Sequence, residues 1–249
     1  MLKYLIKLPF LKRIIPHYYK LYLRLFRIKN TKFIFENLIF DLDTRYLIDR
    51  HFYFTGSYEE EEFIYLNSKI KKNNIKYFLD IGACWGIYSL RIANKFKNIN
   101  VQSFEPIVKN KKRLDDSILL NNISNIKSHN TAIGNYDGKL DLNVDSNFSP
   151  NYYFKKNEKS IQTEVCKLSK LDSLLSIKNT TIAIKIDVEA YELEALLGAK
   201  NLLTNNKCIV LIEIDANNKK NVFNFFKEND FKFEKFSKSE GNNYFFSNL

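Results

Sequence analysis

From Tyr77 onward, short β-branched and apolar runs alternate with amphipathic segments of helical periodicity. The expected strands are residues 77–81, 101–105, 126–133, 161–168, 181–187 and 208–214. The expected helices between them are residues 86–97, 108–121, 191–203 and 217–229. Repeated strand–helix units pack as a mostly parallel sheet with helices on both faces. The sequence therefore predicts an α/β fold with a seven-stranded sheet, closed by an antiparallel pair at residues 231–237 and 242–248.

Other segments surround this core. Residues 31–57 predict short strands or a hairpin that covers the core, and residues 139–144 predict a further hairpin strand. Residues 59–72 predict a helix, because acidic residues at its start and lysines at its end match the helix dipole. Residues 145–160 predict a loop over a pocket, whose aromatic side chains either stack on a ligand or pack under the loop. They are Phe148, Tyr152, Tyr153 and Phe154.

The positive charge is concentrated at the N-terminus. Of the net charge of +11, residues 1–33 carry nine units, and the first acidic residue is Glu36. The basic residues are Lys3, Lys7, Lys12, Arg13, Lys20, Arg24, Arg27, Lys29 and Lys32. The rest of the chain is nearly neutral, so we expect no nucleic-acid partner. We divide the chain into a basic amphipathic arm with a short cap, residues 1–55, and one domain, residues 56–249.

The arm has two interpretations. Its charges recur too often for a membrane-spanning segment or a signal peptide. It is either an amphipathic element on an anionic membrane surface or a partner, or a helix packed on the domain with a solvated basic face. The three cysteines are far apart and show no zinc spacing, which indicates a reducing, cytoplasmic compartment. Nothing in the sequence predicts the oligomeric state.

The strongest local motif is Asp80-Ile-Gly82-Ala83-Cys84-Trp-Gly86, at a strand-to-helix junction. Glycine lets the backbone turn sharply and approach a ligand, and the helix presents its N-terminus there. Glu105 ends the next strand, where a carboxylate accepts hydrogen bonds from ribose hydroxyls, and Pro106 starts the following helix. The structural alternatives are an ordinary glycine turn and a helix N-terminal carboxylate. The combination favours nucleoside binding.

Six segments in this order and spacing resemble the FkbM family of S-adenosylmethionine-dependent methyltransferases: DIGACWGIYS, SFEP, AIGNYDG, LDSLL, IKIDVEAYE and VLIEI. The resemblance covers about residues 56–248 and implies a Rossmann-like class I methyltransferase fold with S-adenosyl-L-methionine as cofactor. It implies that the first motif holds the methionine and ribose, that Glu105 holds the ribose, and that Thr131 and Ala132 border the adenine. The expected cofactor contacts are Asp80, Gly82, Ala83, Cys84, Gly86, Glu105, Pro106, Thr131, Ala132 and Asp187.

The chain departs from the family pattern at two positions. Cys84 replaces the usual Asn, which removes a polar contact but keeps a small side chain. Ala190 replaces the usual Gly. We expect the backbone conformation at this position to be one that alanine can adopt. Cys84 is not expected to be a nucleophile, because no basic partner is evident nearby in the sequence.

Ionisable residues interrupt the end of the strand at 181–187. Lys185, Asp187 and Glu189 alternate there, so they share one face while the strand persists. We predict Asp187 as the central catalytic residue, contacting the methionine amine or the acceptor hydroxyl, with Glu189 and Lys185 next. The alternative is an ion-pair network that orders the strand end. Glu213 and Asp215 end the neighbouring strand and join the group, whereas Glu192 and Glu194 are expected to be solvated.

The resemblance implies O-methylation of a sugar or another hydroxylated natural product, and a sugar in a surface polysaccharide or glycan is the first choice. A hydroxyl needs a base, which a carboxylate cluster supplies directly or by holding a divalent cation (Mg²⁺ or Mn²⁺), with Asp187 and Glu213 as ligands. Other candidate bases are His129, His17 and His51, although His129 is expected to be structural. The rival functions are an RNA methyltransferase, whose basic arm holds phosphates, and a cofactor-binding scaffold without catalysis.

Overall fold

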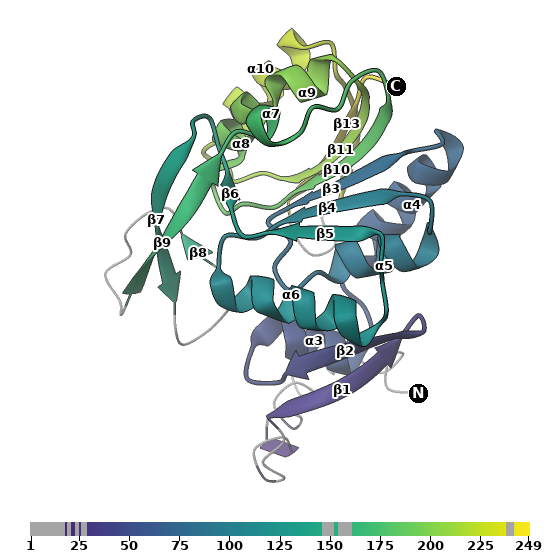
Figure 1. Ribbon diagram of the computed structural model, residues 1–249, viewed down its shortest axis with the longest axis vertical. Helices are drawn as coiled ribbons and strands as arrows, with labels where there is room; N and C mark the ends of the chain where they lie inside the picture. The colour runs from purple at the N-terminus through teal and green to yellow at the C-terminus, as the bar shows by residue number, and fades with distance from the viewer. Residues whose placement is uncertain are drawn as a thin grey trace.

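The centre of the protein is a seven-stranded sheet in the order β12-β13-β11-β10-β3-β4-β5 (Figure 1). The computed structural model describes residues 29–145, 152–153, 161–237 and 242–249, together with Tyr18, Leu21, Tyr22 and Leu25. β13 runs antiparallel to both of its neighbours and the other strands are parallel, so the predicted mostly parallel sheet is confirmed. The strands are β3 (Tyr77–Ile81), β4 (Asn100–Phe104), β5 (Ile126–His129), β10 (Thr181–Ile186), β11 (Lys207–Glu213), β12 (Lys232–Ser237) and β13 (Asn243–Ser247).

Helices cover both faces of this sheet (Figure 1). They are α4 (Glu60–Lys72), α5 (Ile87–Lys95), α6 (Val108–Leu120), α7 (Leu171–Leu174), α8 (Glu192–Gly198), α9 (Lys200–Thr204) and α10 (Lys219–Glu228). Alternate residues of β10 enter different cores: Ile184 packs with α8, α9 and α10, and Ala183 packs with α4 and α5. Lys185 therefore points to the face that carries α4 and α5.

The strand order reverses its direction of growth at the middle of the sheet. From β3 the chain builds outward to β4 and β5, and it then crosses to β10 and β11 on the other side. Ligands of open α/β sheets bind outside the carboxyl ends of the strands at such a reversal. The loops after β3 and β10 are therefore the structural candidates for a site.

The expected single strand at 126–133 is wrong, because the segment is two strands that are interrupted at Asn130. Its side-chain amide donates to the carbonyl oxygens of Glu105 and Pro106, both at 2.9 Å. β5 ends before this residue, and β6 (Ala132–Ile133) joins a second sheet in the order β6-β9-β7-β8. Its other strands are β7 (Gly138–Asp145), which confirms the predicted hairpin strand, β8 (Tyr152–Tyr153) and β9 (Ile161–Ser169). Phe148 and Phe154 lie outside the described residues.

The expected helix at 191–203 is two helices, α8 and α9, separated at Ala199. Just before the break, Gly198 packs against the turn at Gly134. A Cβ atom on Gly198 would lie 1.8 Å from the Gly134 carbonyl oxygen, so only glycine allows this approach.

The N-terminal cap consists of the hairpin β1 (Asn30–Phe35) and β2 (Leu38–Asp43), followed by α3 (Leu47–Thr55). The hairpin was predicted, but α3 was not. Phe52 on α3 lies edge-on to Phe40 at 5.2 Å between ring centroids and 5.9 Å from Trp85, in the loop after β3. The cap thus shares a hydrophobic core with the sheet, and the division at residue 55 remains a prediction.

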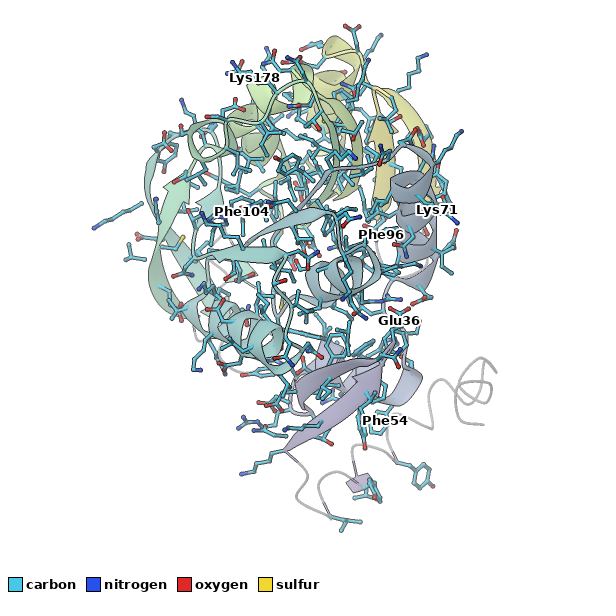
Figure 2. The ribbon with its side chains drawn as sticks, turned by 45° about the vertical axis from the view of Figure 1, so that its right-hand side comes forward. Glu36, Phe54, Lys71, Phe96, Phe104 and Lys178 are labelled. Carbon is cyan, nitrogen blue, oxygen red and sulfur yellow. The ribbon has the colours of Figure 1, made fainter. Side chains whose placement is uncertain are left out.

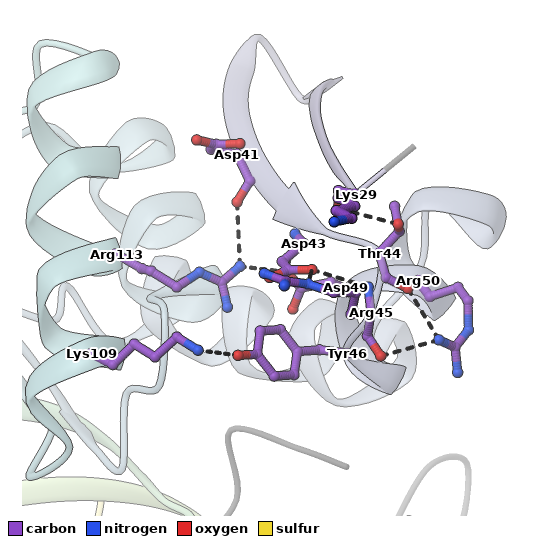
Figure 3. A network of polar contacts seen from close by, with 10 residues as sticks. All are labelled: Lys29, Asp41, Asp43, Thr44, Arg45, Tyr46, Asp49, Arg50, Lys109 and Arg113. Carbon is purple, nitrogen blue, oxygen red and sulfur yellow. Dashed lines mark hydrogen bonds and ion pairs between the residues drawn. The ribbon is translucent and has the colours of Figure 1, made fainter. Parts of the chain in front are cut away.

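Cationic side chains on α5 and α6 also contact the cap. The Arg113 guanidinium on α6 donates to Asp49 of α3, and Lys109 donates to the Tyr46 hydroxyl (Figure 3). Arg91 of α5 donates to Glu36, in the turn between β1 and β2, at 2.9 Å. These contacts connect the cap to α5 and α6.

Candidate active site

The loop after β3 lies across the end of β4. The backbone N–H groups of Gly82 and Ala83 donate to the carbonyl of Phe104, at 2.9 and 3.0 Å. The next N–H group, that of Cys84, donates to a carboxylate oxygen of Glu105 at 2.8 Å. Two motifs that are far apart in sequence thus form one hydrogen-bonded unit.

Glu105 is a buried carboxylate in a fixed orientation. Its second oxygen accepts the N–H of Ile107 at 2.9 Å, and the residue is 1% exposed. Burial raises the pKa of Glu105 to about 7, although both backbone donors favour the ionised form. A carboxylate held this way at the end of β4 is suited to accept bonds from two vicinal hydroxyls.

The two glycines of the motif are required by packing. A Cβ on Gly82, which has φ +81°, would lie 1.8 Å from the carbonyl oxygen of Asp187. A Cβ on Gly86, with φ +89°, would lie 2.2 Å from the Leu114 side chain of α6. Gly82 thereby brings the loop after β3 into contact with the loop after β10.

Both departures from the family pattern lie in left-handed backbone. Cys84 has φ +50° and Ala190 has φ +69°, a region that Asn and Gly adopt more readily than other residues. The expectation that alanine suits position 190 is therefore wrong, and the residue is strained. Burial and the nearby Glu105 raise the pKa of the Cys84 thiol well above its usual value, which disfavours the reactive thiolate form.

A buried lysine stands at the end of β10. Lys185 donates to a carboxylate oxygen of Asp187 at 2.8 Å and lies 3.9 Å from one of Glu59. It is 4% exposed, and β10 places it opposite Asp80 of β3 in the parallel register. Burial lowers the pKa of Lys185, but the surrounding carboxylates outweigh burial and raise it overall. Lys185 and Asp187 therefore form an ion pair, as the alternative interpretation of this strand end predicted.

Three carboxylates converge at this point. One oxygen atom from each of Glu59, Asp187 and Glu213 lies within 4.8 Å of the others. Burial, with a smaller contribution from Asp187, raises the pKa of Glu213 to about 8. Burial likewise raises the pKa of Glu59 to about 7 against the opposing effect of Lys185. The pKa values of Glu59 and Glu213 are therefore both raised toward or above neutral pH.

The sequence did not single out Glu59 or Tyr58. Glu59 is the first of four consecutive glutamates, which predict only a helix start, yet it is 2% exposed at φ +46° before α4. Tyr58 is half-buried, and burial together with Glu59 raises its phenol pKa well above the usual value. Asp187, Glu213 and the Cys84 thiol add to that rise.

Two other acidic residues lie in the loop after β10 and at the start of α8. β10 ends at Ile186, so Glu189 leaves the strand face and occupies a turn at φ +47°. Burial and Asp187 raise the pKa of Glu189 to about 7. Glu192 was expected to be solvated, which is wrong: it is 2% exposed and accepts the N–H groups of Ala190 and Asp215. It fastens the loop after β10 to the loop after β11.

The expected adenine border is buried. Thr131 donates its hydroxyl to the Lys167 carbonyl at 3.1 Å, and Ala132 packs with Ile107 and Cys166 beside Glu105. His129 is structural: its ring stacks on Phe104 at 4.7 Å between centroids, and Nε2 pairs with Gln102 at 2.8 Å. His51 is exposed on α3, and His17 lies outside the described residues.

The comparisons with known proteins agree with the motifs. Residues 80–235 match the Methyltransferase FkbM domain. The chain belongs to the FkbM methyltransferase family.

Solved structures with similarity to this FkbM protein are remote. TYW2 from M. jannaschii, in complex with AdoMet, shares 11% identity over 88% of this chain and 84% of that chain, with a TM-score of 0.46. The ribosomal protein L11 methylase from Lactobacillus delbrueckii subsp. bulgaricus shares 14% identity over 77% and 79%, with a TM-score of 0.45. A search of curated proteins found no match.

The residues of this FkbM protein fit S-adenosylmethionine by their chemistry. Glu105 offers a fixed acceptor for the ribose hydroxyls, and the backbone of Gly82 to Cys84 lies hydrogen-bonded beside it. Asp80 itself accepts the Ser89 hydroxyl at 2.5 Å and so ties α5 to β3. The individual cofactor contacts remain predictions.

The same residues do not fit a divalent cation. Asp187 and Glu213, the expected ligands, do lie together, and carboxylate oxygens suit Mg²⁺. The ammonium of Lys185, however, already lies 2.8 Å from Asp187 within the cluster. A divalent ion there would face a buried like charge, whereas the lysine supplies the counter-charge that the carboxylates need.

Proposed function

We propose that the protein is an S-adenosylmethionine-dependent O-methyltransferase acting on a hydroxyl of a sugar, in a surface polysaccharide or another glycan. The observation that carries the proposal is the carboxylate cluster of Glu59, Asp187 and Glu213 beside the loop after β3. An alcohol is a poor nucleophile until a base takes its proton, so a base at this place suits a hydroxyl acceptor. The glycan class rests on the family.

Different residues bind the cofactor and take the proton of the acceptor. Glu105 holds the ribose, and the backbone of Gly82 to Cys84 shapes the cradle beside it. S-adenosylmethionine supplies the methyl group when bound. Lys185 fixes Asp187, so we assign the base to Glu213, which is half-buried and not ion-paired at hydrogen-bond distance to Lys185 among the described residues. Glu59 exchanges protons with it, and Tyr58 orients the acceptor.

Activity then rises with pH. The raised pKa of Glu213, about 8, means that it keeps its proton at lower pH and becomes a base as the pH passes this value. Because the Lys185 ammonium, and not a metal ion, is the cation of the cluster, chelators are expected to leave turnover unchanged.

The test supplies methyl-labelled cofactor to the protein with a panel of glycans and RNA, with EDTA or with Mg²⁺. We expect label on a glycan hydroxyl oxygen, located by mass spectrometry, in both conditions. Glu213→Gln should lower kcat about 100-fold or more with an unchanged cofactor Kd, and the exposed Glu228→Gln serves as control. Label on RNA alone, or cofactor binding without turnover on any acceptor, would support the rival functions and contradict the proposal.

The location remains a proposal. Cys84, Cys166 and Cys208 are free thiols, which suits the cytoplasm. Among the described residues, no helix has the length and apolar character needed to cross a bilayer.

A further inference from the structure

Asn243, the first residue of β13, carries a buried side-chain amide. The residue is 1% exposed, and within the part of the chain that the structure describes neither Oδ1 nor Nδ2 has a hydrogen-bond partner. A buried amide in this state costs stability, and most buried polar groups in proteins are bonded. Exceptions to this rule concentrate at functional sites, where stability is given up for activity.

The strand register places this amide beside Glu213. Asn243 lies directly opposite Glu213, the last residue of β11, in the antiparallel pairing of the two strands. The backbone hydrogen bond next to the pair runs from the N–H of Ile214 to the carbonyl of Asn242, at 3.0 Å. Because narrow and wide pairs alternate, Glu213 and Asn243 form a non-hydrogen-bonded pair, the kind whose side chains come closest. Rotation of the side chains is enough to bring the amide to the carboxyl group.

Both side chains lie on the face of the sheet that α4 covers. The next pair on this face is Leu211 and Phe245, which belong to the same core as Ala183. Tyr65 of α4 lies edge-on to Phe245 at 4.6 Å between ring centroids. Figure 2 shows α4, which ends near the labelled Lys71, next to the yellow C-terminal strands. Asn243 is therefore on the face that carries the carboxylate cluster.

We propose that Asn243 is a positioning residue for Glu213, an inference that rests on the proposed function. When Glu213 has released its proton to solvent, the Asn243 N–H donates to one carboxylate oxygen. The other oxygen is then turned toward the acceptor and takes the hydroxyl proton. Lys185 holds Asp187 in a comparable way, by donating to one of its carboxylate oxygens at 2.8 Å.

The test uses two substitutions of similar shape. Asn243→Leu removes the amide, and Asn243→Asp replaces the donor nitrogen with an oxygen. On the glycan that the wild type methylates, we expect both to lower kcat about 10- to 100-fold, the value of one hydrogen bond to a charged group. The KM for the glycan and the Kd for S-adenosylmethionine should stay within about threefold. In a Glu213→Gln background, Asn243→Leu should lower kcat no further, because no base is left to position.

Asn67→Leu is the matched control. Asn67 is 7% exposed on α4, and its Oδ1 is likewise buried without a partner among the described residues. It lies about two helical turns beyond Glu59, away from the cluster, and its variant should keep the wild-type kcat. A wild-type kcat in both Asn243 variants, or an additive loss in the Glu213→Gln background, would overturn the inference.

Thermal melts distinguish positioning from a structural role. Asn243→Leu removes an unbonded buried amide and should melt at or above the wild-type temperature. A marked fall in melting temperature, together with an Asn243→Asp variant of wild-type kcat, would assign Asn243 to the fold and overturn the inference.

Failure of the proposed function gives a different result. A wild type that methylates no glycan would contradict the O-methyltransferase proposal, and a crystal structure then tests the contact alone. With S-adenosylhomocysteine at about pH 9, one unit above the Glu213 pKa of about 8, Asn243 Nδ2 should lie about 2.7–3.2 Å from the Glu213 carboxylate. A separation above about 4 Å in those crystals would overturn the inference.

Discussion

Glu105→Gln tests the cofactor cradle most directly. The carboxylate already accepts the N–H groups of Cys84 and Ile107, and its remaining lone pairs are expected to accept the two ribose hydroxyls. A hydrogen bond to a charged acceptor contributes about 1.5–3 kcal/mol, and one to a neutral acceptor about 0.5–1.5 kcal/mol. Gln keeps one acceptor oxygen and no charge, so the loss is about 2–4 kcal/mol, or roughly 30- to 1,000-fold in Kd.

The assay is titration calorimetry with S-adenosylmethionine near pH 8. Glu228→Gln on α10 makes the same chemical change at an exposed site and should leave Kd within about threefold. Thermal melts verify that the Glu105 variant is folded, because the amide group must face one of the two backbone donors. A folded Glu105→Gln protein with wild-type affinity would refute the assignment.

The pH dependence provides a second check. The raised pKa of Glu105, about 7, means that the unliganded protein holds this proton at lower pH and must release it to accept the ribose hydroxyls. Affinity should therefore be flat above this value and fall about tenfold per pH unit below it. The Gln variant has no such proton and should lose this dependence. An equal wild-type Kd at about pH 5.5 and about pH 8 would contradict the reasoning.

Three substitutions test the backbone and the cap by chemical denaturation. Gly82→Ala should lower the free energy of unfolding by about 3 kcal/mol or more and abolish cofactor binding, because its Cβ would meet a backbone oxygen at 1.8 Å. Gly138→Ala, whose Cβ meets only an aromatic side chain at 3.2 Å, is the control, and equal effects would contradict the clash. Ala190→Gly should raise the free energy of unfolding by about 1 kcal/mol by relieving left-handed strain, and a loss would refute that. Phe52→Ala should cost about 3–5 kcal/mol, and a neutral effect would mean that the cap is not part of the core.

Local patterns predicted most of the elements. The apolar run at β3 and the periodicity of α6 are properties of a few consecutive residues, and both elements formed within one or two residues of their expected ends. The interruption of the strand at Asn130 was missed, because the interruption depends on hydrogen bonds from the Asn130 side chain to carbonyls about two dozen residues earlier. The helix α3 was missed because an aromatic-rich segment fits either a strand or a helix, and packing decides.

The sequence by itself determined the parallel sheet, the glycine-containing loop and the acid at the end of β4, because alternation, glycine and strand order are local or additive properties. Only the tertiary structure decided that Glu59 belongs with Asp187 and Glu213, and that Lys185 is the cation among them. The physical reason is that burial and electrostatic interaction depend on which distant segments meet. Four consecutive glutamates are equivalent in sequence, yet Glu59 and Glu62 are buried, and Glu59 lies 3.9 Å from Lys185, which is 126 positions away.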